Sequence, residues 1–428
     1  MSGYLIRGGC VISMDQKVGN HLVGDVLIQD DRIVEVGSNL RARNAEVVDA
    51  SDAIVMPGFV DSHRHVWESL FRGLGDLAGS SDPAPLLGPH YSADDVYAAT
   101  LIGLLGAVEA GITSVADWAD IRPEHVPAAL QAHADAAVRT VFAPAGASWS
   151  EDGDWQAASV AVEESPLLTA AAGPPVPLQD LARLSAEWGR ARQSNLRIHA
   201  HSGTDPSQRG EVAGAADLLD ADVTLVHCSS LGESDFDAVA AAGASVALAP
   251  SSEMAKGHEP PPMQRLIDRH IRPGLAVDTE RLAPGDLFAP MRAAISIQHA
   301  THFDLKLAGK GGLPTLLTTR EVIRYATIDG ARAIGLGHVT GSLTPGKQAD
   351  VIVLRADRPN IAPINDPIGA VVWGMDTSNL DWVFVAGQPR MRHGIVEADL
   401  SRVRSLASEA HRRVASAAGI LTGAGVEA

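Results

Sequence analysis

The sequence predicts an α/β protein, with a parallel (β/α)8 barrel of the TIM type and a small β-sandwich domain formed by both chain ends. Three observations predict this architecture. The middle of the 428-residue chain alternates strand-like apolar runs with helical periodicity. The two ends instead alternate apolar and polar residues at every second position. Finally, histidines or a carboxylate end several of the central strands, as expected at the catalytic face of such a barrel.

The two ends of the chain share one sequence pattern. Short alternating runs separated by glycine and aspartate turns are typical of antiparallel strands, and they occur at 4–7, 25–29, 32–36, 349–354 and 382–387. We therefore expect residues 1–56 and 340–398 to form one small β-sandwich domain. Residues 399–428 are predicted to form a closing helix, over 400–418, and a tail.

The middle of the chain, residues 57–339, is predicted to form the barrel. Its first helix is expected over 92–110, with Ser92 as the N-cap and Asp95 at the third helical position. Further helices are predicted at 123–137, 178–193, 210–219 and 233–242. The predicted strands number eight, at 53–60, 112–117, 139–145, 167–172, 196–201, 223–227, 245–249 and 274–278.

The triplet His63-Arg64-His65 ends the first predicted barrel strand. Because side chains alternate faces along a strand, His63 and His65 can reach one point while Arg64 faces elsewhere. Two converging imidazoles suit Zn²⁺ or Fe²⁺. An isolated His-x-His can equally be a pair of solvated loop residues, so the interpretation depends on the other strands.

Further groups of metal-ligand type end other strands. His199 and His201 end the fifth strand, His227 ends the sixth and Asp278 ends the eighth. A single histidine at a strand end is more often a hydrogen-bonded structural residue. Because the carboxyl ends of barrel strands share one rim, four strands ending in this way predict a metal site there.

These motifs resemble the amidohydrolase superfamily, in particular its cytosine and guanine deaminases and atrazine-type chlorohydrolases. The resemblance spans essentially the whole chain, and the segments that carry it are 55–65, 111–117, 249–252, 326–333 and 341–351. It implies that His63, His65, His201 and Asp278 bind one divalent ion, Zn²⁺ or alternatively Fe²⁺. It also implies that His227 contacts the nucleophilic water and the substrate.

Binuclear members of the superfamily bridge two metals with a carboxylated lysine that ends the fourth strand. No lysine occurs from residue 18 to 255, so one ion per chain is expected. His199 matches a less regular position and is a candidate substrate contact.

One departure from the resemblance concerns proton transfer. Deaminases of the superfamily carry a glutamate three residues after the fifth-strand histidine, where this chain has Thr204. Threonine cannot act as an acid at neutral pH. Asp205, Glu253 and Glu280 are the nearby alternatives, although each is more simply a structural carboxylate. Glu280 is the first choice, because it lies two residues beyond Asp278.

Tryptophans follow the first three barrel strands, at Trp67, Trp118 and Trp149. They are candidates for walling a flat substrate, with packing against neighbouring loops as the equally weighted alternative.

The expected reaction uses a metal-activated water. Asp278 would take the proton of the water and return it to the leaving group, while His227 stabilises the developing oxyanion. The first hypothesis is displacement of an exocyclic amine or similar leaving group from a nitrogen heterocycle. The second is hydrolysis of an amide, urea or lactam bond, which Thr204 favours. The third is a non-catalytic relative that binds a small molecule, which the intact ligand set disfavours.

The composition of the chain limits the kinds of partner that the protein is expected to bind. A formal net charge of −18 argues against nucleic acid and anionic membranes. Two cysteines far apart in sequence give no disulfide framework. With neither a signal-like segment nor an apolar run of spanning length, we expect a cytoplasmic protein. Its partners are expected to be a small-molecule substrate and further copies of itself in a homo-oligomer.

Overall fold

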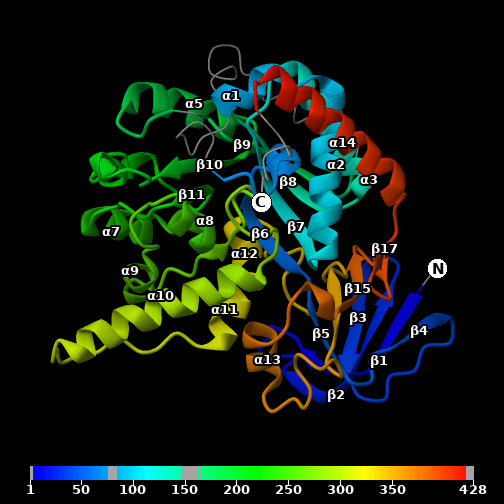
Figure 1. Ribbon diagram of the computed structural model, residues 1–428. Helices are drawn as coiled ribbons and strands as arrows, with labels where there is room; N and C mark the ends of the chain where they lie inside the picture. Colours follow the sequence, from blue (N-terminus) through cyan, green and yellow to red (C-terminus); the bar gives the residue numbers. More distant parts are fainter. Residues whose placement is uncertain (1–2, 76–83, 146–161, 163–164, 175, 421–428) are drawn as a thin grey trace, which may run out of the picture.

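The fold, in a computed structural model that describes residues 3–75, 84–145, 162, 165–174 and 176–420, contains two sheets. One is an eight-stranded parallel sheet from the middle of the chain. The other is a nine-stranded mixed sheet from both ends, which lies beside the barrel (Figure 1). The predicted fold class is confirmed.

The barrel strands follow one another in sequence order. They are β6 (Phe59–Arg64), β7 (Ile112–Ala119), β8 (Arg139–Pro144), β9 (Leu168–Ala172), β10 (Arg197–Ser202), β11 (Val223–His227), β12 (Ser245–Leu248) and β13 (Gly274–Leu275). The last strand is shorter than predicted. Backbone hydrogen bonds from Asp278 to His63 (3.0 Å) and from His65 to Asp278 (2.8 Å) join its extension to β6. The first and last ligand-bearing segments therefore lie side by side.

Helices and short 3-10 turns surround the barrel. The main ones are α2 (Ala93–Glu109), α3 (Val126–Ala136), α5 (Leu181–Gln193), α7 (Glu233–Ala242), α10 (Phe288–Leu307), α11 (Thr319–Tyr325) and α12 (Ile328–Ala333). Shorter segments are η1 (Val66–Phe71), α1 (Ala84–Leu87), η2 (Gly88–His90), η3 (Pro123–His125), η5 (Pro206–Gln208), α6 (Glu211–Gly214), η6 (Ala216–Leu218), α8 (Pro250–Ala255) and α9 (Met263–Asp268). Ser92 and Asp95 form the expected capping box of α2. Among the described helices, none has the length and apolar character needed to cross a bilayer.

The mixed sheet joins the two chain ends in the order β17-β16-β15-β14-β5-β1-β2-β3, with β4 paired to β1. Its strands are β1 (Gly3–Ile12), β2 (Asn20–Gln29), β3 (Arg32–Gly37), β4 (Ala45–Asp49), β5 (Ala53–Pro57), β14 (Val351–Arg355), β15 (Leu380–Val385), β16 (Gln388–Arg392) and β17 (Ile395–Val396). The join is the antiparallel pair β5–β14, with Val55 opposite Val353. Because β5 continues almost directly into β6, this sheet anchors the strand that carries His63.

An ion pair and a helix–helix contact hold two further parts of the chain in place. Arg139 on β8 makes a buried bidentate ion pair with Asp350, which precedes β14, and so ties the barrel to the mixed sheet. The C-terminal helix α14 (Leu400–Ala417) packs along α2 (Figure 1). Helix α13 (Pro367–Trp373) and η7 (Thr377–Asn379) lie between β14 and β15 in the chain.

Candidate metal centre and active site

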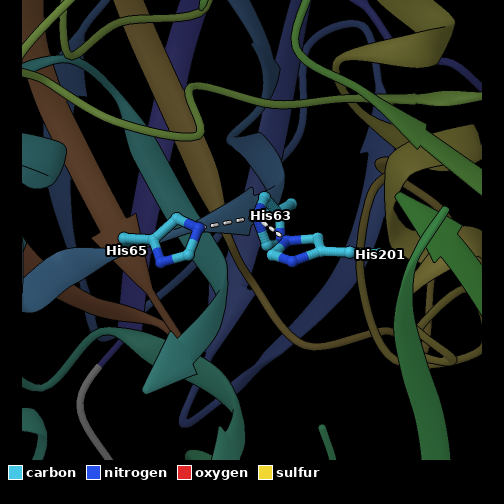
Figure 2. Close-up of side chains that lie close together, drawn as sticks. All are labelled: His63, His65 and His201. Atoms are coloured by element: carbon cyan, nitrogen blue, oxygen red, sulfur yellow. Dashed lines mark hydrogen bonds between the residues drawn. The ribbon is translucent and has the colours of Figure 1, made fainter. Parts of the chain in front are cut away.

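Four predicted ligands converge at the carboxyl ends of the barrel strands. The Nε2 atom of His63 lies 3.2 Å from Nε2 of His65 and 3.1 Å from Nε2 of His201. Figure 2 shows these three rings turned toward one another. The Oδ1 atom of Asp278 lies 3.7 Å from Nε2 of His63 and 3.5 Å from Nε2 of His65. The donor atoms predicted from the strand ends therefore lie close together in the structure.

The donor set fits a divalent ion. Donor atoms bound to one Zn²⁺ at bond lengths of about 2.0–2.2 Å lie roughly 3–4 Å apart, which is the spacing found here. Three imidazole nitrogens this close cannot each be satisfied by a proton. In addition, Oδ1 of Asp278 is buried and has no hydrogen-bond partner in the described part of the chain. A cation is the group that satisfies all four atoms at once.

Burial keeps the ligands in the forms that bind metal. Burial, together with the neighbouring imidazoles, lowers the pKa of His63 and of His201 well below the ordinary value. Burial alone would raise the pKa of Asp278, but Lys256 and the surrounding histidines outweigh it and hold that pKa well below its usual range. Neutral imidazoles beside an ionised carboxylate are the protonation states that metal binding requires.

The other carboxylate oxygen of Asp278, Oδ2, accepts hydrogen bonds from two residues that follow β12, one in α8 and one at the end of that helix. Lys256 Nζ donates to Oδ2 over 2.6 Å and Ser252 Oγ donates to the same atom over 2.5 Å. These contacts fix the carboxylate so that its other oxygen, Oδ1, faces the imidazoles. Neither residue was predicted from the sequence, because both reach the site from a helix and loop outside the strand pattern.

His227 is held by Glu253. Its Nδ1 atom lies 3.1 Å from Oε1 of Glu253, which also accepts from the backbone N–H of Ala249. The carboxylate fixes the proton of His227 on Nδ1, so that Nε2 is free to face the metal centre. His227 also falls with His63 and Asp278 in one group of possible metal donors. Of the three carboxylates considered as replacement acids, Glu253 is the one that contacts this histidine.

The position of Glu280 argues against its predicted role as the replacement acid. Its carboxylate is paired with Arg64 (2.8 Å) and Arg72 (2.9 Å) and accepts from Ser69 (2.6 Å). Burial would raise the pKa of Glu280, but the two guanidinium groups hold it below the ordinary value. The reason is local: Asp278 adopts φ +64°, which turns the chain and removes the alternation that would have put Glu280 on the same face.

The other fifth-strand candidates are Thr204, Asp205 and His199. Thr204 is bound through its N–H and its hydroxyl to Gln208, and Asp205 caps the exposed turn η5. His199 is buried on β10, and burial together with Arg197 lowers its pKa to about 3. It belongs to neither group of possible metal donors in the described chain.

One of the three predicted tryptophans contacts a predicted metal ligand. The ring of Trp118 stacks on His201 with 4.3 Å between centroids, so it forms one wall of the metal centre. Trp67 is buried beside Tyr91. Trp149 lies outside the described residues.

Two further side chains near the metal centre were not predicted. His258 packs edge-on against His227 at 5.4 Å, and burial and then His227 lower its pKa to about 4. Glu68 is buried next to His65, with 3.9 Å between Oε1 and Nδ1, and also pairs with Arg281. Glu68 lies three residues after His65, so its proximity follows the turn of η1 rather than any strand rule.

Comparison with known proteins gives curated relatives over most of the chain. A 5′-deoxyadenosine deaminase from Methanothermobacter thermautotrophicus is 27% identical over 407 residues, which cover 87% of this chain and 90% of the relative. A 5-methylthioadenosine/S-adenosylhomocysteine deaminase from Haloarcula marismortui is 28% identical over 444 residues, with 96% and 98% covered.

Solved structures share the fold. An adenosine deaminase from Xanthomonas campestris with bound zinc superposes with a TM-score of 0.85 at 20% identity, covering 96% of this chain and 98% of that one. Atrazine chlorohydrolase from Arthrobacter aurescens TC1 complexed with zinc gives a TM-score of 0.81 at 21% identity, covering 95% and 100%. The profile of the Amidohydrolase family matches residues 54–398, which include all four predicted metal ligands. The resemblance seen in the sequence is thereby confirmed: the chain belongs to the amidohydrolase family.

Proposed function

We propose that this protein is a mononuclear, metal-dependent hydrolase that displaces an exocyclic amine, or a similar leaving group, from a nitrogen heterocycle. The observation that carries the proposal is the convergence of His63, His65, His201 and Oδ1 of Asp278 on one point. We propose one ion per chain, zinc in the first place and Fe²⁺ as the alternative. The deaminase names of the relatives support an amine leaving group.

A divalent ion held by these residues would supply Lewis-acid activation of water near neutral pH. Residues of the chain would carry out the proton transfer. Asp278 would accept a proton from the attacking water and deliver it to the departing amine, so that water and the aminoheterocycle become ammonia and the hydroxylated ring. His227, fixed by Glu253, would stabilise the oxyanion that develops during attack.

The missing glutamate shapes the substrate range. Thr204 offers no acid, and the geometry ties Glu280 to two arginines. The second candidate function, hydrolysis of an amide, urea or lactam bond, is favoured by this one observation, because such substrates need no protonated ring nitrogen. The cytoplasmic location and the homo-oligomeric assembly stay predictions, and light scattering during size-exclusion chromatography tests the second.

The deciding experiment is a product assay on zinc-loaded protein. The panel contains 5′-deoxyadenosine, cytosine, guanine, a chlorinated triazine and a set of lactams and ureas. Ammonia or chloride release from a heterocycle supports the first function, and ring opening of a lactam or urea supports the second. Asp278→Ala serves as the catalytic blank. A metal-replete protein that turns over none of these compounds contradicts both functions.

A further inference from the structure

Two hydrogen bonds converge on one oxygen of the predicted ligand Asp278. Nζ of Lys256 donates to Oδ2 over 2.6 Å, and Oγ of Ser252 donates to the same atom over 2.5 Å. The side chain of Asp278 is fully buried, and that of Lys256 is 13% exposed. Ser252 is fully buried as well. Bulk water therefore competes little for this oxygen.

Both donors come from one turn of helix. Ser252 lies in α8, and Lys256 follows the last residue of that helix. The backbone N–H of Lys256 donates to the carbonyl oxygen of Ser252 over 2.8 Å, so the helical turn includes both residues. Side chains four residues apart lie on the same face of a helix. One turn thus presents an ammonium group and a hydroxyl to the same carboxylate oxygen.

The main chain of Asp278 is fixed separately, by the segment that carries the first two histidines. Its N–H donates to the carbonyl oxygen of His63 over 3.0 Å, and its carbonyl oxygen accepts from the N–H of His65 over 2.8 Å. The main freedom left to Asp278 is rotation of its carboxylate. Lys256 and Ser252 act on that rotation.

The two carboxylate oxygens of Asp278 differ in their unused lone pairs. A carboxylate oxygen offers about two lone-pair positions. On Oδ2, the ammonium group of Lys256 and the hydroxyl of Ser252 take up both. Oδ1 has no hydrogen-bond partner within the described residues, and it is the oxygen that lies 3.5–3.7 Å from the histidine nitrogens. Only Oδ1 can bind a cation without the loss of a hydrogen bond.

We propose that Lys256 and Ser252 are positioning residues that make Asp278 a monodentate metal ligand. An ion bound by three histidines and by Oδ1 alone keeps a position open for the attacking water. A carboxylate that bound through both oxygens would fill that position. The proposal rests on the proposed function in one respect, namely that these four residues bind a single divalent ion.

The two donors differ in what they can do during the proposed proton transfer. An ammonium group can only donate, whereas a hydroxyl can also accept. When Oδ2 takes up a proton, Ser252 can turn its hydroxyl and accept from Oδ2, while Lys256 keeps its own hydrogen bond. Holding Asp278 in this way is therefore compatible with its proposed role as proton carrier.

The first test is the position of Oδ2 in a zinc-loaded double variant, Ser252→Ala with Lys256→Met. The variant removes both donors and keeps an unbranched side chain at position 256. Crystal structures with anomalous diffraction locate the ion. In the unchanged protein, Oδ2 should lie beyond about 2.8 Å from zinc, which exceeds a zinc–oxygen bond. In the double variant, Oδ2 should approach zinc to within about 2.5 Å.

The second test probes the open position in solution and does not depend on turnover. Imidazole, which is uncharged at about pH 8.5, is titrated into cobalt-loaded protein and followed by the visible spectrum of Co²⁺. The double variant should bind imidazole at least about tenfold more weakly, because its second carboxylate oxygen fills the position. An uncharged probe is used so that the loss of the Lys256 charge does not itself explain the result.

Two single variants serve as controls. Lys256→Arg keeps a donor for Oδ2 and should bind imidazole as the unchanged protein does. Ser251→Ala removes the neighbouring hydroxyl of α8, which donates no hydrogen bond to Asp278 in the part of the chain that the structure describes, and should also bind imidazole normally. Should the double variant fail to fold, Lys256→Met alone frees one lone-pair position and should show the same approach of Oδ2 to zinc.

An Oδ2 atom that stays beyond about 2.8 Å from zinc in the double variant overturns the proposal. Equal affinity for imidazole in the unchanged protein and the double variant does so too. Loss of zinc from a folded double variant also contradicts it, because the two donors would then be needed for binding itself.

These outcomes are distinct from those of the proposed reaction. Movement of Oδ2 onto zinc in the double variant, without ammonia release from any heterocycle by the unchanged protein, keeps the positioning role and rejects the deaminase reaction. Ammonia release by the unchanged protein, together with an unmoved Oδ2 in the double variant, keeps the reaction and rejects the positioning role.

Discussion

The metal centre and the junction between the two sheets both bury charged groups, but they use their polar atoms differently. At the junction, Arg139 donates to Asp350 over 2.7 Å and 3.0 Å, and the backbone N–H of Ala386 donates to the same carboxylate over 2.7 Å. At the metal centre, Oδ1 of Asp278 has no partner in the described chain, and the Nε2 atoms of three histidines face one another.

This difference separates structural from functional burial of charge. A buried ion pair whose polar atoms are all paired needs no ligand. Removing one partner leaves the other charge buried and unpaired, which lowers the stability of the fold. A buried cluster with unpaired acceptors is incomplete until something binds to it. The comparison predicts that variants at the junction act on stability, whereas variants at the metal centre act on metal content and turnover.

The largest effect is expected at Asp278. Asp278→Ala removes both a ligand and the proposed proton carrier, so turnover should fall on the order of 10³-fold or more. Bound metal should fall with it. The measurements are steady-state kinetics on the best substrate of the panel and elemental analysis. His199→Asn, a buried histidine of β10 outside the donor groups, is the matched control and should keep its metal. If Asp278→Ala retained a tenth of the activity, the assignment of Asp278 as metal ligand and proton carrier would be contradicted.

The structural role of the junction between the two sheets is tested at Arg139. Arg139→Ala leaves Asp350 buried without its partner and should lower the free energy of unfolding by about 3–5 kcal/mol. Urea unfolding measures the loss, and elemental analysis should find the metal content unchanged. Combining Arg139→Met with Asp350→Leu removes both charges and should recover most of the stability. A loss below about 1 kcal/mol in Arg139→Ala would mean that the junction is not the paired structural site described above.

A smaller effect is expected at Glu253, which contacts His227 rather than the metal ligands. Glu253→Ala releases His227 from its fixed orientation and should lower kcat on the order of 10²-fold with the metal retained. Glu253→Gln keeps an acceptor oxygen for Nδ1 and should recover most of this loss. Loss of metal in step with activity would instead show that Glu253 supports the fold of the site as a whole.

The smallest effect concerns pH and His199. Burial and then Arg197 lower the pKa of His199 to about 3, whereas an unfolded histidine titrates near about 6.5. Below pH 6.5 the unfolded chain therefore binds the extra proton. The stabilising contribution is complete above pH 6.5 and is lost as the pH falls from 6.5 toward 3.

Between pH 7 and pH 5 this contribution should decrease by about 2 kcal/mol. The measurement is urea unfolding of the metal-loaded protein at both pH values, with His199→Asn alongside. The variant should lose about 2 kcal/mol less than the unchanged protein over this interval. Identical pH dependence of the two proteins would show that His199 is protonated in the folded state.

The sequence predicted those parts of the site that obey strand periodicity. His63 and His65 sit two residues apart on one strand, and His201 and His227 end neighbouring strands, so alternation and the common rim of a barrel were enough to bring them together. The fold followed from the same regularities, because parallel strands need crossover connections and leave the repeating pattern of strand and helix in the sequence.

Residues that depend on loops could not be predicted in this way. Lys256 and His258 reach the metal centre from the chain after α8, where no period constrains direction. The positive φ of Asp278 reversed the chain and sent Glu280 to Arg64 and Arg72 instead of the metal centre. Such turns are set by tertiary contacts, which no single stretch of sequence contains.

The central claim, one divalent ion held by three histidines and Asp278, is tested most directly by a crystal structure with anomalous diffraction at the zinc absorption edge. We expect a single anomalous peak per chain, within about 2.0–2.2 Å of Nε2 of His63, His65 and His201 and of Oδ1 of Asp278. Two peaks in the barrel, or one peak that any of these four atoms does not contact, would contradict the account.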